Sequence, residues 1–107
     1  MDGSNYAAVY NLGNSLMKID RYEDAVTQFR RALELRPGQE LAQYNLALAY
    51  QKMGDYESAI ENYELAIDLK ETYRSYVNMA ICYKELEDEE TSDFFYGKAN
   101  ELRGGRR

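Results

Sequence analysis

Three asparagines occupy the same place in a repeating sequence and could bind a peptide backbone. Asn11, Asn45 and Asn78 follow one another at intervals of 34 and 33 residues. A side-chain amide has both a donor and an acceptor, so one asparagine can pair with an N–H and a C=O of an extended chain. Each such hydrogen bond contributes only about 0.5–1.5 kcal/mol net. We therefore expect pockets for side chains beside the asparagines.

The asparagines belong to three copies of one sequence unit. The central copy, Tyr44 to Leu69, recurs upstream at Tyr10 to Leu35 and downstream at Val77 to Leu102. In each copy, apolar residues recur every three to four positions on both sides of a polar turn, which indicates two amphipathic helices. One hairpin cannot bury its apolar side, whereas three stacked hairpins can. The sequence therefore predicts an all-α stack of three antiparallel helix hairpins.

Polar residues and turns mark where the helices begin and end. Asp20, with Glu23 three residues later, has the pattern of a capping box and is predicted to cap the second helix. Asp55, after Gly54, and Asp88 are the predicted caps of the fourth and sixth helices. In the first helix, Ala8, Val9, Leu12, Leu16 and Ile19 form the expected apolar stripe. The second helix is expected to start near Tyr22 and to be ended by Arg36-Pro37-Gly38. The other expected helices are Tyr6 to Lys18, Gln39 to Met53, Tyr56 to Leu69, Thr72 to Leu86, and Glu89 to Leu102.

The three copies resemble the tetratricopeptide repeat (TPR), a family of helical hairpins of about 34 residues. The resemblance covers about Tyr6 to Leu102. It divides the chain into an N-terminal lead at 1–5, repeats at 6–39, 40–72 and 73–103, and a flexible basic tail at 104–107. The residues that carry it are Val9, Leu12, Gly13, Leu16, Ala25, Phe29, Ala32 and Pro37 in the first copy, Leu46, Ala47, Tyr50, Gly54, Ala59, Tyr63 and Ala66 in the second, and Met79, Ala80, Tyr83, Tyr96 and Ala99 in the third.

The resemblance implies a right-handed α-α superhelix whose first helices line a concave groove, and a function as an adaptor or scaffold that binds protein or peptide. The apolar residues of this face would form pockets, and its cations would attract acidic side chains or a terminal carboxylate. Alternatively, the cations serve only solubility. The candidate groove residues are Tyr10, Asn11, Asn14, Met17, Lys18, Leu41, Tyr44, Asn45, Leu48, Gln51, Lys52, Arg74, Asn78, Ile81 and Lys84.

One subgroup of the family binds chaperone tails with a clamp for two carboxylates, and this chain matches the clamp only in part. Asn14 and Asn45 agree with its residue types. Tyr10 stands in place of a lysine, Asn78 in place of an arginine, and Arg74 in place of the other lysine. A heat-shock chaperone tail is therefore an alternative ligand rather than the expected one.

Composition restricts the other classes of function. A net charge of −6 on 107 residues opposes binding to nucleic acid or to an anionic membrane. The apolar runs are far shorter than the roughly 20 residues that span a bilayer, and the first residues lack the pattern of a secretory signal. One cysteine cannot form an internal disulfide, so we expect a cytoplasmic protein. The chain has no histidine and no glycine-rich phosphate loop, which argues against an enzyme, a metal site or a cofactor.

The third copy leaves a second hypothesis open. Repeat arrays usually close with a polar capping helix. Here Glu87 replaces Gly54, Ser92 replaces Ala59, and Phe94 and Phe95 could remain exposed. The third copy could act as the cap, the chain could be part of a longer array, or the third repeat could join copies into a homo-oligomer. Cys82 takes the place of Ala49 and is expected to be a small core residue.

Overall fold

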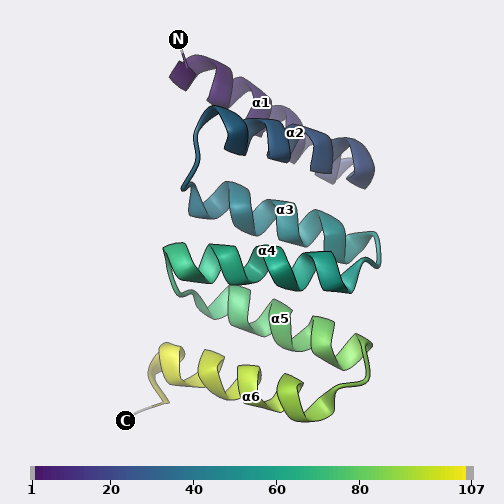
Figure 1. The fold of residues 1–107 in the computed structure, drawn as a ribbon, viewed down its shortest axis with the longest axis vertical. Coiled ribbons are helices and arrows are strands. Elements are labelled where there is room, and N and C mark those ends of the chain that lie inside the picture. The colour runs from purple at the N-terminus through teal and green to yellow at the C-terminus, as the bar shows by residue number, and fades with distance from the viewer. Residues whose placement is uncertain (1, 106–107) are drawn as a thin grey trace.

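The chain forms three antiparallel helix hairpins stacked one on the next, as predicted. The computed structural model describes residues 2–105, with dimensions of 44 × 29 × 19 Å. Figure 1 shows the first hairpin at one end of the stack and the third at the other. The helices are α1 (Asp2–Lys18), α2 (Tyr22–Leu35), α3 (Glu40–Lys52), α4 (Tyr56–Leu69), α5 (Tyr73–Glu85) and α6 (Glu89–Asn100), followed by the short π-helical segment η1 (Glu101–Gly105).

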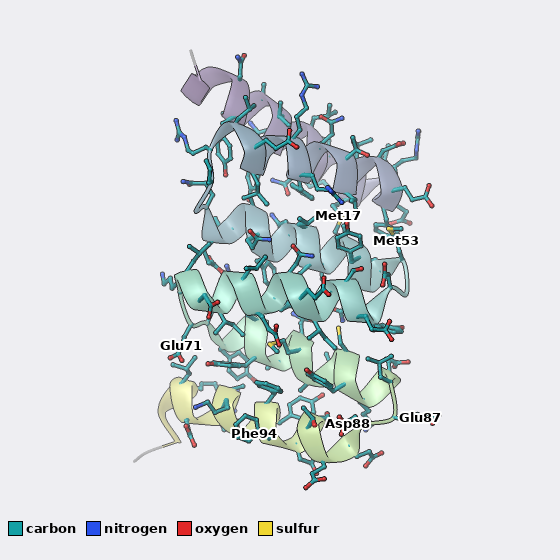
Figure 2. The ribbon with its side chains drawn as sticks, in the orientation of Figure 1. Met17, Met53, Glu71, Glu87, Asp88 and Phe94 are labelled. Carbon is teal, nitrogen blue, oxygen red and sulfur yellow. The ribbon has the colours of Figure 1, made fainter. Side chains whose placement is uncertain are left out.

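The turn between the two helices of each hairpin uses a left-handed residue. Gly54 has φ +84°, and Asp20 and Glu87 occupy the same place with φ +62° and +65°. The residue that follows is the N-cap: Asp55 accepts from the backbone N–H of Ser58 at 3.2 Å, and Asp88 from that of Thr91 at 3.1 Å. Figure 2 shows Glu87 and Asp88 at the α5–α6 turn. The predicted caps of α4 and α6 are therefore confirmed.

The predicted cap of α2 is wrong. Asp20 is the left-handed turn residue, and its carboxylate accepts a hydrogen bond from the hydroxyl of Tyr22 at 2.7 Å. Arg21 is the N-cap, and its side chain makes no capping hydrogen bond. The capping-box pattern with Glu23 misplaced the cap by one residue, because aspartate tolerates the left-handed conformation as well as the cap position.

The ends of the chain differ from the expected boundaries. α1 begins at Asp2, so residues 2–5 of the expected lead belong to the first helix. At the other end, α6 stops at Asn100, and Gly104 has φ +104° inside η1. Of the expected basic tail, Arg106 and Arg107 lie outside the described residues.

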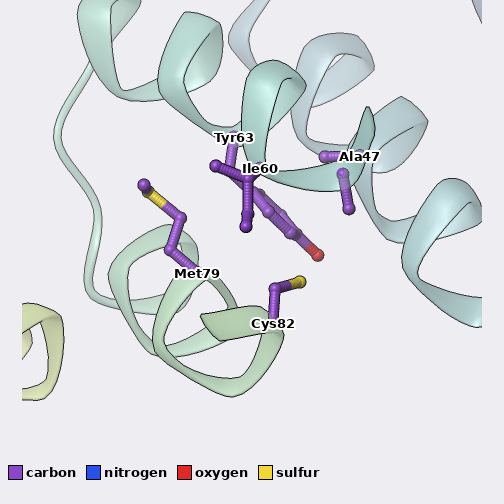
Figure 3. Packing of buried hydrophobic residues seen from close by; sticks show 6 residues of the cluster. Ala47, Ile60, Tyr63, Met79 and Cys82 are labelled. Atoms are coloured by element: carbon purple, nitrogen blue, oxygen red, sulfur yellow. The ribbon is translucent and has the colours of Figure 1, made fainter. Parts of the chain in front are cut away.

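The core lies both within the hairpins and between them. Phe29 of α2 is fully buried in a cluster with Leu46 and Ala49 of α3. One repeat later, Tyr63 of α4 is buried in a cluster with Met79 and Cys82 of α5. Figure 3 shows Ile60 and Tyr63 facing these two residues. Cys82 is therefore a small core residue, as expected, and small residues allow the helices to approach closely.

Part of the expected apolar stripe of α1 is not in the core. Leu12 is 47% exposed and Ile19 63%, and Ala8 is also exposed. No helix precedes α1 among the described residues, and none of the described helices covers this side of the first hairpin. At the other end Phe94 is 59% exposed, as expected. Phe95 is partly buried, with its ring stacked on that of Tyr83 at a centroid distance of 5.6 Å.

Candidate binding face on the first helices

The first helices of the three hairpins lie on the inner side of the stack. Among the described residues, α1 contacts α3 and α3 contacts α5, whereas successive second helices approach each other less closely. A stack whose members are closer on one side bends toward that side. The candidate groove therefore lies on the face made by α1, α3 and α5.

Every candidate groove residue retains some exposure to solvent. The exposed ones are Asn11, Lys18, Leu41, Lys52 and Lys84. The partly buried ones are Tyr10, Asn14, Met17, Tyr44, Asn45, Leu48, Gln51, Arg74, Asn78 and Ile81. The face thus combines solvent-accessible cations with a floor of half-buried polar and apolar side chains.

Asparagine and tyrosine side chains link neighbouring hairpins along the floor of this face. The amide nitrogen of Asn45 donates to the hydroxyl of Tyr10 at 3.0 Å and to Oδ1 of Asn14 at 3.2 Å. The amide nitrogen of Asn78 donates to the hydroxyl of Tyr44 at 3.0 Å and to the carbonyl of Arg74 at 2.9 Å. Each amide thus already uses both of its hydrogens, and its oxygen is the atom that remains for a ligand. The expected simultaneous pairing with an N–H and a C=O therefore needs these bonds to open.

Arg74 is held by residues of the preceding hairpin. Its Nη2 donates to both carboxylate oxygens of Glu40, at 2.9 and 2.7 Å, and its guanidinium lies 4.5 Å from the ring centroid of Tyr44. The positive charge of Arg74, which was expected to attract an acidic group of a ligand, is therefore neutralised by Glu40 within the chain. Glu40 was not among the candidates, although its spacing of one repeat from Arg74 is a signal that could have identified it.

Burial changes the protonation behaviour of the tyrosines that support this face. Burial raises the pKa of Tyr44 above its ordinary value, and burial raises that of Tyr63 further still. The hydroxyl of Tyr63 donates to Oε1 of Gln51, so this groove residue also satisfies a buried donor. Both phenols stay neutral at physiological pH and act as hydrogen-bonding groups.

The three lysines of this face have no acidic partner within residues 5–104. Lys18, Lys52 and Lys84 each lie in the last turn of a first helix, so all three are at the same edge of the stack. Arg21 and Arg74 provide the two ion pairs found in the described residues. A cation in the last turn interacts favourably with the helix dipole, and it remains available to an anionic ligand.

Comparison with known proteins identifies the repeat. Models of the tetratricopeptide-repeat family match residues 5–72 and residues 73–105. The chain belongs to the tetratricopeptide-repeat family. TPR domains generally mediate protein–protein interaction. A search of curated proteins found no match to this TPR chain.

Solved TPR structures share the fold of this chain. A crystal structure of MamA is 29% identical with a TM-score of 0.90, and the match covers 94% of this chain and 60% of that one. The TPR domain of Arabidopsis FLU is 23% identical with a TM-score of 0.87, covering 92% of this chain and 94% of that one. The first TPR domain of Spaghetti (RPAP3), solved with the HSP90 peptide SRMEEVD, is 20% identical with a TM-score of 0.86, covering 91% and 78%. The present TPR chain thus spans about three fifths of the MamA chain. None of its described helices is long and apolar enough to cross a bilayer.

Proposed function

We propose that the chain is a TPR adaptor whose inner face binds an extended or helical segment of a partner protein. The observation that carries the proposal is the row of lysines without acidic partners beside apolar side chains that the stack does not need for its own core. Lys18, Lys52 and Lys84 lie at one edge of the face. The partly buried Leu48 and Ile81 precede Lys52 and Lys84 by about one helical turn, and Leu41, which is 54% exposed, lies at the other end of α3. A protein of net charge −6 thus presents cations on the face that its repeats expose to a ligand.

The ligand that fits this face has apolar side chains and acidic groups at one end. Leu41 and the partly buried Leu48 and Ile81 would contact the apolar side chains. The lysine edge would attract the acidic groups, which agrees with the acidic sequence of the peptide bound to the Spaghetti (RPAP3) domain. The side-chain oxygens of Asn45 and Asn78 would accept backbone N–H groups of the ligand.

A two-carboxylate clamp for chaperone tails is the weaker alternative for the same face. Asn14 and Asn45 match the clamp, and Nδ2 of Asn45 lies 3.2 Å from Oδ1 of Asn14. Arg74, which stands in place of a clamp lysine, is instead paired with Glu40. We propose no catalytic role for the chain. A cytoplasmic setting is also part of the proposal, since the single cysteine, Cys82, is buried as a free thiol.

A peptide-library screen against the chain, followed by charge reversal, tests the proposed function. Peptides selected by the wild-type chain should be rich in acidic residues at one end. Replacing Lys18 and Lys52 together by glutamate should weaken their binding by about tenfold or more, because two attractive charges become repulsive. The control is Lys70→Glu, which reverses a single lysine charge at the opposite edge, after α4. Equal binding by the control and the double variant would refute the proposed groove.

A further inference from the structure

The outer side of α1 carries the same kinds of residues that α3 and α5 bury against the preceding hairpin. In α3 these are Ala42, Leu46 and Ala49, which are 0%, 5% and 0% exposed. In α5 they are Ser75, Met79 and Cys82, which are 0%, 1% and 0% exposed. The corresponding residues of α1 are Ala8, Leu12 and Ser15, and all three are exposed. The pattern of two small residues flanking one large apolar residue thus occurs in α1, α3 and α5. Among the described helices, only the set on α1 has no helix packed against it.

The two covered sets show what kind of partner the uncovered one fits. α2 places Val26 and Phe29 against Leu46, and α4 places Ile60 and Tyr63 against Met79. The first helix of the same covering hairpin adds a tyrosine hydroxyl, which accepts from the asparagine that precedes the large apolar residue. Asn11 precedes Leu12 in the same way and is exposed. The outer side of α1 is therefore a continuation of the stacking interface that the chain already uses twice.

The third hairpin of a second copy does not supply the matching surface. α6 carries Asp93 where α2 and α4 carry Val26 and Ile60. It carries Asn100 where they carry Leu33 and Ile67, and α5 carries Val77 where α3 carries the hydrogen-bonding Tyr44. Stacking α6 on α1 would bury a carboxylate against Leu12 and leave Asn11 without an acceptor, and both changes are costly. The charge and polarity of α6 thus argue against a second copy as the occupant and favour a hairpin of different sequence.

We propose that the outer face of α1, formed by Ala8, Asn11, Leu12 and Ser15, binds a helical hairpin of a partner protein. The partner packs one amphipathic helix on Leu12 as α2 packs on Leu46, and it presents a hydroxyl to the amide of Asn11. This surface lies at the end of the stack (Figure 1) and adjoins the proposed groove, with which it shares Asn11. The chain thereby gains a second contact, which lets it join a stacked partner to a peptide held in the groove.

A peptide copy of the first hairpin tests the surface directly. The probe is a synthetic peptide of residues 6–39 that carries Leu12→Lys, so that it offers Val26 and Phe29 but cannot stack on itself. It is titrated into the full chain by fluorescence anisotropy, with circular dichroism to follow helix formation. We expect saturable binding, weakened by about ten- to hundredfold when the full chain carries Leu12→Lys, the loss that follows from one leucine no longer buried. The control Leu65→Lys, at an exposed leucine of α4, should leave binding unchanged.

Three outcomes would overturn the proposal. The first is the absence of saturable binding at probe concentrations up to about 1 mM, the range of the weakest specific complexes. The second is equal binding to the Leu12→Lys variant and to the wild-type chain, which would mean that the probe displaces a hairpin of the stack instead. The third is concentration-dependent dimerisation of the wild-type chain in sedimentation that Leu12→Lys abolishes, because the occupant would then be a second copy.

Discussion

The amide nitrogen of Asn78 in α5 donates to the hydroxyl of Tyr44 in α3 at 3.0 Å, and the same bond joins Asn45 to Tyr10 one repeat earlier. The asparagines that the sequence presents as ligand-binding groups are thus also the connection between neighbouring hairpins. The guanidinium of Arg74 also lies over the ring of Tyr44, 4.5 Å from the ring centroid. The floor of the inner face is therefore held by the residues that a ligand would meet.

Removing the hydroxyl of Tyr44 should weaken the stack. Tyr44→Phe keeps the ring and leaves the amide of Asn78 with one acceptor fewer, so we expect a loss of about 0.5–1.5 kcal/mol in the free energy of unfolding. Urea denaturation measures it. In a double-mutant cycle with Asn78→Ala, the two losses should be less than additive. Tyr73→Phe is the control, since within the described residues that hydroxyl accepts a hydrogen bond only from the exposed Arg103. Full additivity of the cycle would show that the hydrogen bond contributes nothing.

Two glycines inside helices should respond in opposite ways to alanine. A Cβ on Gly13 would lie 2.6 Å from Cε1 of Phe29, whose buried ring cannot withdraw. Overpacking costs about 1–3 kcal/mol, which exceeds the gain of about 1 kcal/mol in helix propensity, so Gly13→Ala should lower stability. Gly97 in α6 has no atom within 4 Å of the same position, and Gly97→Ala should raise stability by about 0.5–1 kcal/mol. Thermal unfolding compares the two, and a gain for Gly13→Ala would contradict the packing of α1 on α2.

Two buried serines should also respond in opposite ways to alanine. Ser92 donates to the carbonyl of Ala80 at 2.8 Å, whereas the buried hydroxyl of Ser75 has no partner within the described residues. Ser75→Ala removes an unsatisfied group at the place where α3 has Ala42, so it should stabilise the chain by about 1 kcal/mol. Ser92→Ala removes a made hydrogen bond and should destabilise it by about 0.5–1.5 kcal/mol. Equal shifts of the urea midpoint in the two variants would mean that the hydroxyl of Ser75 is satisfied in solution.

The fold could be predicted because the same pattern of apolar residues and turns recurs in each repeat. The bounds of α4, Tyr56–Leu69, agree with the prediction to the residue, since a glycine and an aspartate cap mark the turn before it. The same signal failed at Asp20, because an aspartate there serves as the turn residue in place of glycine. The exposure of Leu12 was missed for a different reason, because helical periodicity shows which side of α1 is apolar and not whether another helix covers it.

The chemistry of the inner face was predictable only in part. Periodicity placed Lys18, Lys52 and Asn45 on one face, since side chains at helical spacing share a side. The partners of its polar groups depend on contacts between hairpins one repeat apart. Arg74 pairs with Glu40, and Asn45 with Tyr10, in the neighbouring repeat. These pairs could be predicted only by comparing residues of two successive repeats, and they decide which polar groups remain for a ligand.

Alkaline pH should destabilise the fold because it favours deprotonation of a buried thiol and a buried phenol. Burial raises the pKa of the Cys82 thiol to about 12, and burial together with the hydrogen bond to Glu71 raises the pKa of Tyr76 to about 12. In the unfolded chain the pKa of the thiol is about 8.5 and that of the tyrosine is about 10. The folded state thus keeps protons that the unfolded state releases. The contribution of these two groups to the free energy of unfolding should be constant below about pH 8 and fall as the pH rises from about 8.5 toward 12.

The Cys82→Ala variant separates the thiol from the tyrosines. Alanine occupies the equivalent place in α3 as Ala49 and is buried there, so the substitution should be tolerated. Urea denaturation between pH 7 and pH 11 should then show stability that stays constant up to about pH 9 and falls only where the tyrosines titrate, near about 10. A Tyr76→Phe variant should keep the earlier decline, since its thiol is intact. If Cys82→Ala and the wild-type chain lose stability from the same pH and with the same slope, the thiol is not protected by the fold and its burial between α4 and α5 is incomplete in solution.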